Sequence, residues 1–109
     1  MSSTSKRLEF FLKQTAADGA AKDDAFAWYG LAMEYRALSR QDDALATFER
    51  LRSRSPEYVA MYLMCGQMLE QMGRLDEARS WFDAGIEAAR KKGDGHSLSE
   101  LEAALAALE

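Results

Sequence analysis

Apolar residues recur along the chain at steps of three and four, the spacing of one face of an α-helix. Turn signals divide the sequence into six such segments. The first covers residues 5–17, and the second begins after an N-cap at Asp23 or Asp24. The third has Asp42 and Asp43 in its first turn, where acidic side chains are favoured. β-Branched residues are scarce, so we expect an all-α chain with almost no strand.

The later segments have start and stop signals of their own. The sequence Ser-Pro-Glu at 55–57 is typical of a helix start, with serine as N-cap and proline at the first helical position. This fourth helix should end at Gly73, and a fifth should run from near Leu75 to Gly93. The sequence Ser-Leu-Ser-Glu at 97–100 is a capping box, which predicts a sixth helix with one leucine-lined face. Short turns between these helices predict antiparallel neighbours.

The chain also repeats itself at an interval of 34 residues, as from Ala44 to Ala78 and from Phe48 to Phe82. The positions that agree carry small or aromatic residues. Small residues let two helix backbones approach closely, and aromatic rings fill the space between neighbouring helices. The interval therefore predicts two copies of one helix pair, stacked side by side.

These residues resemble a tetratricopeptide repeat. That family has Trp, Leu, a small residue and Tyr on the first helix, then a small residue and Phe on the second, then Pro. Residues 25–58 match at Trp28, Leu31, Ala32, Tyr35, Ala44, Phe48 and Pro56. A weaker copy over 59–92 matches at Tyr62, Gly66, Gly73, Ala78 and Phe82. It departs with Cys65, Leu69 and Arg90, where Leu, Tyr and Pro are usual.

The resemblance implies a fold, a right-handed α–α superhelix of the tetratricopeptide-repeat (TPR) solenoid type. We expect a single domain over 1–109, with an N-terminal helix at 5–17, repeats at 25–58 and 59–92, and a capping helix at 97–108. The residues expected to pack the repeats are Trp28, Leu31, Ala32, Tyr35, Ala44, Phe48, Tyr62, Gly66, Ala78 and Phe82. The chain also looks similar to small, stand-alone bacterial members of the family.

The composition of the chain restricts its possible partners and location. The net charge of −4 gives no general attraction to nucleic acid or to anionic lipid. The single cysteine, Cys65, excludes an intrachain disulfide and fits a reducing cytoplasm. No stretch is long and apolar enough for a signal segment or a membrane span. We therefore expect a cytoplasmic protein that binds neither nucleic acid nor membrane.

Reactive groups are few. His96 is the only histidine and should lie in a turn, which is too little for a metal site. Cys65 should be a small core side chain, because no basic partner lies within helical reach. The sequence Gly-Asp-Gly at 93–95 is a turn and has no phosphate-binding pattern. We predict no metal, no cofactor and no catalytic activity.

In the family, the first helices of successive repeats line a concave groove. The resemblance places eight residues there: Phe26, Tyr29, Met33 and Arg36 from repeat one, and Ala60, Leu63, Gln67 and Glu70 from repeat two. Some members hold the carboxylate of an acidic peptide tail with Lys, Arg and Asn at such positions, but here Tyr29, Met33, Leu63 and Gln67 occupy them. An apolar or amphipathic polypeptide segment is the better candidate ligand.

Two functions remain open. The chain is either a non-catalytic module that binds another protein in this groove, or a scaffold that self-associates through the groove or the C-terminal helix, for example as a homodimer. In the second case a further subunit or the C-terminal helix would cover the groove. The sequence does not identify the partner.

Overall fold

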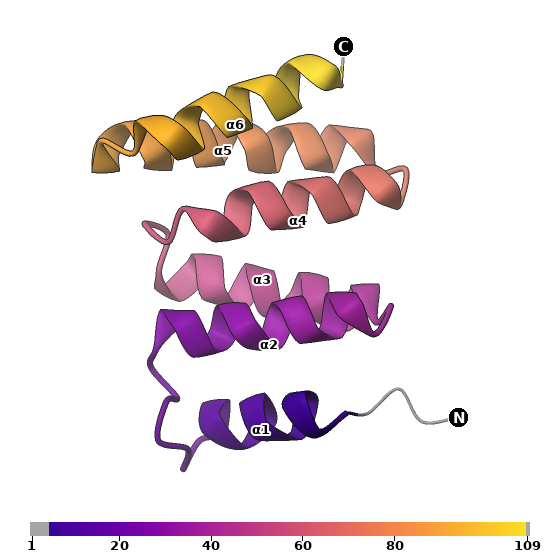
Figure 1. Cartoon of the computed structure of the whole chain (residues 1–109), viewed down its shortest axis with the longest axis vertical. Coiled ribbons are helices and arrows are strands. Elements are labelled where there is room, and N and C mark those ends of the chain that lie inside the picture. The colour runs from indigo at the N-terminus through magenta and orange to yellow at the C-terminus, as the bar shows by residue number, and fades with distance from the viewer. Residues whose placement is uncertain (1–4, 109) are drawn as a thin grey trace. The chain divides into compact units, whose positions relative to one another are not determined.

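The computed structural model describes residues 5–108, which contain six α-helices and no strand (Figure 1). The helices group into two compact units of three, one ending at Ser55 and the other beginning at Pro56. Each unit is described by itself. The single domain expected over 1–109 stays a prediction, and its residues 1–4 and 109 lie outside the described range.

The first unit contains α1 (Lys6–Thr15), α2 (Ala25–Ala37) and α3 (Gln41–Arg54). Helix α2 packs against both of the others (Figure 1). Ser5 caps α1 by accepting a hydrogen bond from the Leu8 amide, and Asp24 caps α2 by accepting one from the Phe26 amide. Of the two aspartates predicted as the cap of α2, Asp24 is therefore the one used.

The second unit contains α4 (Ala60–Gln71), α5 (Leu75–Lys92) and α6 (Gly95–Ala107). Helix α5 packs against α4 and α6, and α6 also contacts α4. The predicted stop signals are confirmed. Gly93 directly follows the end of α5, and Gly73 lies one residue beyond the C-cap of α4. Their φ angles are positive, 71° and 79°, conformations that glycine adopts at little steric cost.

The predicted start of α4 is wrong. Ser55 is the C-cap of α3, and α4 begins only at Ala60. The Tyr62 hydroxyl donates a 2.6 Å hydrogen bond to the Pro56 carbonyl, which holds Pro56 in the turn before the helix. Serine followed by proline suits a turn as well as a helix start, and here this tertiary hydrogen bond favours the turn.

The predicted capping box at 97–100 is also wrong. Helix α6 begins at Gly95, and its N-cap is Asp94, whose carboxylate accepts hydrogen bonds from both the hydroxyl and the amide of Ser97. These two bonds lower the pKa of Asp94 below its usual range. His96, expected in a turn, lies instead in the first turn of α6, with its imidazole 3.1 Å from the Glu100 carboxylate.

The same turn joins the two helices of each pair. The amide of Arg40 donates to the Tyr35 carbonyl, and the amide of Arg74 donates to the Leu69 carbonyl, both at 2.9 Å. This pattern is a Schellman motif, which requires a left-handed residue just before the donor. The residue is Ser39 in the first unit, with a φ of 61°, and Gly73 in the second. The first unit therefore contains a strained serine where the second has glycine.

This difference gives a prediction with opposite signs at two equivalent positions. Ser39→Gly should raise the free energy of unfolding by about 0.5–1 kcal/mol, because it removes the steric cost of the left-handed conformation. Gly73→Ala should lower it by about 1 kcal/mol for the same reason, since a Cβ there would meet no neighbour within 4 Å. Urea unfolding followed by circular dichroism measures both. Changes of the same sign would contradict the backbone explanation.

Trp28 and Tyr62 are equivalent in the 34-residue repeat. Each side chain donates a hydrogen bond to a backbone carbonyl in the segment before its helix. The Trp28 indole donates a 2.7 Å hydrogen bond to the Lys22 carbonyl, and the Tyr62 hydroxyl donates to the Pro56 carbonyl. In both units the acceptor lies six residues before the donor. Both rings are buried, so the hydrogen bonds satisfy polar groups that would otherwise be costly to bury.

Candidate peptide-binding surfaces

The residues predicted to pack the repeats are placed as follows. Trp28, Leu31, Ala32, Ala44, Phe48, Tyr62, Gly66, Ala78 and Phe82 are buried, and Tyr35 is partly exposed. Within the second unit, Gly66 on α4 lies so close to Phe82 on α5 that a Cβ on residue 66 would overlap the ring. The Tyr35 ring lies beneath the Arg40 guanidinium, 4.8 Å from its centroid.

Helix α2 divides into a buried face and an exposed stripe. The stripe contains the four residues predicted for repeat one, Phe26, Tyr29, Met33 and Arg36, at steps of three, four and three. Phe26 is 66% exposed, the highest value of any large apolar side chain described. The other three are partly exposed. These four side chains are therefore not fully buried in the core of the unit.

Burial raises the pKa of Tyr29 above its ordinary value, and the positive charge of Arg36 opposes that shift only in part. The Tyr29 hydroxyl therefore stays protonated near neutral pH.

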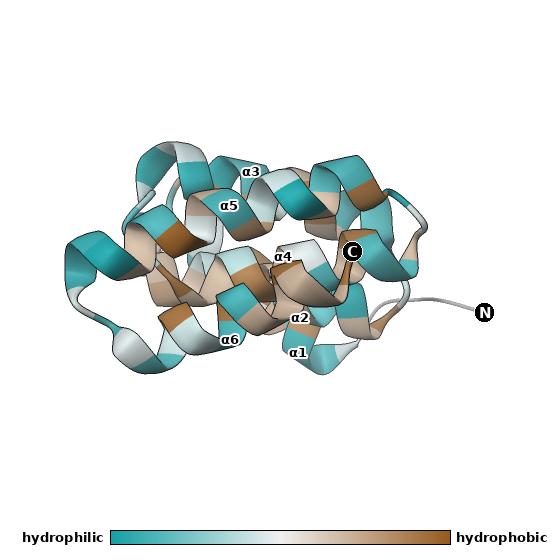
Figure 2. Cartoon of the chain, turned by 90° about the horizontal axis from the view of Figure 1, so that it is seen from above, coloured by the Kyte–Doolittle hydropathy of each residue, from teal (hydrophilic) through white to brown (hydrophobic). Residues whose placement is uncertain are grey.

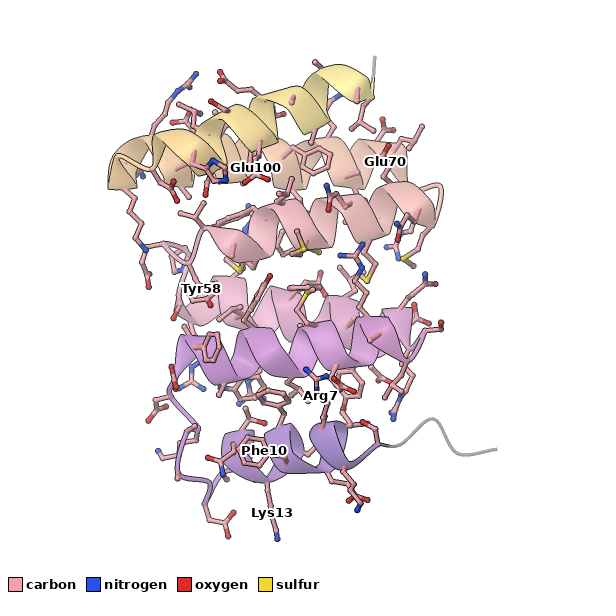
Figure 3. All side chains as sticks on the ribbon, in the orientation of Figure 1. Arg7, Phe10, Lys13, Tyr58, Glu70 and Glu100 are labelled. Atoms are coloured by element: carbon pink, nitrogen blue, oxygen red, sulfur yellow. The ribbon has the colours of Figure 1, made fainter. Side chains whose placement is uncertain are left out.

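Helix α4 shows the corresponding stripe in the second unit. Ala60 is exposed, and Leu63, Gln67 and Glu70 are partly exposed. Gln67, Glu70 and Gln71 line a shallow cleft of about 440 Å³ on this helix, and Figure 3 labels Glu70 near the end of α4. This stripe is more polar than that of α2. Because the two stripes belong to different units, a single groove formed by both remains a prediction.

A polar contact between α1 and α2 was not predicted from the sequence. Glu34 lies on the buried side of α2, accepts a 2.9 Å hydrogen bond from the Ser5 hydroxyl and lies 3.6 Å from the Arg7 guanidinium. A signal was present, because Glu34 lies three residues after Leu31 and so shares its helix face. The contact fixes α1 on α2 without creating a reactive group.

The second unit has a cleft that was not predicted. Its volume is about 470 Å³, and it lies between the turn before α4 and the second half of α5. Pro56, Tyr62, Ala84 and Ala88 contribute apolar surface, while Glu57, Glu87, Lys91 and Lys92 contribute charges. The four charged side chains are all exposed to solvent, which screens their charges.

Groups with reactive potential are sparse in the described part of the chain. Cys65 forms no disulfide, and its side chain is fully buried. Residues 5–108 contain no cluster of three or more His, Cys, Asp or Glu side chains placed to hold a metal ion. Within the same range, no helix has the length and apolar character needed to cross a membrane.

The fold thus defines a class, the all-helical repeat proteins built from stacked helix pairs. Within this class the chain belongs to the tetratricopeptide repeat family. The sequence model of that family matches residues 29–92. No match is found among curated proteins. Tetratricopeptide repeat proteins are generally non-catalytic modules that bind proteins or peptides.

Two solved structures of a tetratricopeptide repeat domain protein from Salinibacter ruber resemble this chain. The solution NMR structure has 38% sequence identity and a TM-score of 0.76, over 79% of this chain and 87% of the other. The crystal structure has 38% identity and a TM-score of 0.73, over 78% and 94%. The expected all-α TPR solenoid is therefore confirmed, as is the resemblance to small bacterial members of the family.

Proposed function

We propose that the chain binds an apolar or amphipathic polypeptide segment through the exposed stripes of α2 and α4. The observation that carries this proposal is Phe26, a phenylalanine 66% exposed on a helix whose other face already supplies the core. Exposed aromatic side chains of this kind are common anchors in protein interfaces. Tyr29 and Met33 extend the apolar surface along α2.

The charged groups suggest how such a segment would be oriented. Arg36 lies at the end of the α2 stripe, and Glu70 lies at the end of the α4 stripe. Neither stripe has a cluster of cations, so a ligand with a run of acidic residues would find little to pair with. An amphipathic helix, with its apolar face toward Phe26 and Tyr29, suits the α2 stripe better.

A peptide selection tests this proposal. A displayed library of random peptides is selected against the wild-type chain, and enriched peptides are titrated by calorimetry. Phe26→Ala combined with Leu63→Ala should weaken their binding by at least about tenfold, because truncating a buried anchor commonly costs more than 1 kcal/mol. Both side chains have exposed surface, so the helical circular dichroism signal should not change.

Leu75→Ala is the matched control, since Leu75 is 46% exposed and lies on α5, so it belongs to neither stripe. It should leave the affinity of the selected peptides unchanged. Failure to enrich any peptide, or equal affinity for the double variant and the wild type, would contradict the proposal.

A further inference from the structure

Helix α1 has an outward stripe that the first unit does not use. Lys6, Phe10 and Lys13 follow one another at steps of four and three, and so share one face of the helix. All three are exposed, Phe10 by 56%. Figure 3 shows Lys13 projecting from α1 on the side away from α2. Two cations, about 10 Å apart along the helix, thus flank an exposed aromatic ring.

The opposite face of α1 already accounts for its place in the fold. Leu8 and Thr15 are buried there, and Phe11 contacts α2 at Gly30, where a Cβ would overlap its ring. The Phe10 ring packs edge-to-face with the Phe11 ring, at a centroid distance of 5.5 Å, and is still 56% exposed. The outward stripe is therefore available for a partner without any change in the unit.

The second unit has a cleft of complementary character between α5 and α6, with a volume of about 550 Å³. Its apolar surface comes from Ile86, Leu105 and Ala106. Its charged rim consists of Asp83, Glu87, Glu102 and Arg90, three carboxylates against one guanidinium. Arg90 lies 3.0 Å from Glu87 and 4.0 Å from Glu102, which leaves the rim with a net negative charge.

Helix α6 itself resembles an interface helix. Only Leu101 is fully buried, while Leu98, Leu105 and Leu108 are partly exposed. Figure 2 shows brown, apolar bands recurring along α6. A helix that is apolar around much of its circumference is typical of a position covered by further protein.

We propose that α1 of one copy docks into the α5–α6 cleft of a second copy, so that chains associate head to tail. Phe10 would cover Ile86 and Leu105, and Lys6 and Lys13 would meet the carboxylates of the rim. Symmetric pairings are disfavoured by charge: two α1 stripes would oppose lysines, and two clefts would oppose carboxylates. The opposite charges of the two surfaces therefore favour head-to-tail association with a second copy of the chain. This inference does not depend on the proposed peptide-binding function.

The contact is small, because one helix face meets two helices. We therefore expect weak association, with a dissociation constant of about 0.1 mM. The ion pairs would be exposed to solvent, so association should weaken in about 0.5 M salt. Because the two surfaces differ, each added copy leaves one surface open at either end, and oligomers should lengthen with concentration.

Analytical ultracentrifugation of two blocked variants tests this arrangement. Phe10→Asp removes the anchor and places an acid opposite the acidic rim, and Ala106→Arg fills the cleft with a cation. Both positions are exposed, so both variants should keep the helical content of the wild type. The wild type should form species larger than a dimer, and each variant alone should be a monomer. An equimolar mixture should form a dimer and nothing larger, because one intact surface remains on each partner.

Leu75→Asp is the control, an equally polar change at an exposed leucine outside both surfaces. It should self-associate as the wild type does. A wild type that remains monomeric up to about 1 mM, ten times the expected dissociation constant, would overturn the proposal. So would self-association of Phe10→Asp, which would indicate a symmetric contact elsewhere, or an equimolar mixture that stays monomeric.

Discussion

Alanine in place of Phe82 is expected to lower the free energy of unfolding by about 3–5 kcal/mol, the usual cost of removing a fully buried phenylalanine. The ring is inaccessible to solvent and lies against Gly66 of α4, where an added Cβ would overlap it. Small domains are stable by only about 5–15 kcal/mol, so this loss would leave the second unit marginal. Urea unfolding followed by circular dichroism measures it. Phe48→Ala, at the equivalent and equally buried position of the first unit, should cost about as much.

Phe10→Ala provides the comparison at a phenylalanine that is 56% exposed. Its effect should be within about 0.5 kcal/mol, as is usual for surface positions. A loss below about 1 kcal/mol for Phe82→Ala would mean that Phe82 does not hold α4 and α5 together.

Gly66→Ala is the second substitution with a large expected effect. The new methyl group would overlap the Phe82 ring, which is fully buried and has little room to move. Overpacking of this kind costs about 1–3 kcal/mol, although alanine is the better helix former. Urea unfolding again gives the measurement. Adding Phe82→Leu should recover part of the loss, because a shorter side chain leaves space for the methyl group.

Gly95→Ala separates helix propensity from packing. A Cβ at Gly95 would meet no neighbour within 4 Å, and the residue is already in α6. This change should be neutral or stabilise by up to about 1 kcal/mol. If Gly66→Ala behaved like Gly95→Ala, or if the losses from Gly66→Ala and Phe82→Leu simply added, the close approach of α4 and α5 would not be the cause.

The helices could be predicted because the signals that specify them are local. The step of three and four residues gave the six helices, and glycines 73 and 93 marked the ends of α4 and α5. The errors lie where two local signals compete. Asp94 and Ser97 are both good caps, and the aspartate is used because its carboxylate binds two groups of Ser97 at once.

The start of α4 depends on a contact that no local pattern contains. Pro56 is held in a turn by the hydroxyl of Tyr62, and the sequence around Pro56 alone equally favours a helix start. The same limit applies to the clefts. The α5–α6 cleft is lined by residues of both helices, among them Ile86 and Leu105, so its shape depends on the angle between two helices rather than on residue types.

The candidate binding stripe of α2 was predicted from the resemblance to the family, and helix geometry is consistent with it. Once Trp28, Leu31 and Ala32 are assigned to the core, helix geometry leaves Phe26, Tyr29 and Met33 on another face. Glu34 shows where such reasoning stops. Its position on the inner face follows from spacing, but its partners Ser5 and Arg7 come from a separate helix and its cap.

The chain has two tryptophans, and the fold gives one to each unit: Trp28 on α2 and Trp81 on α5. Both indoles are buried, so their emission should shift to longer wavelength when the surrounding helices separate. A chain that keeps only one of them carries an internal optical reporter for one half of the molecule. Comparing the two single-tryptophan chains would measure how strongly the halves cooperate during unfolding.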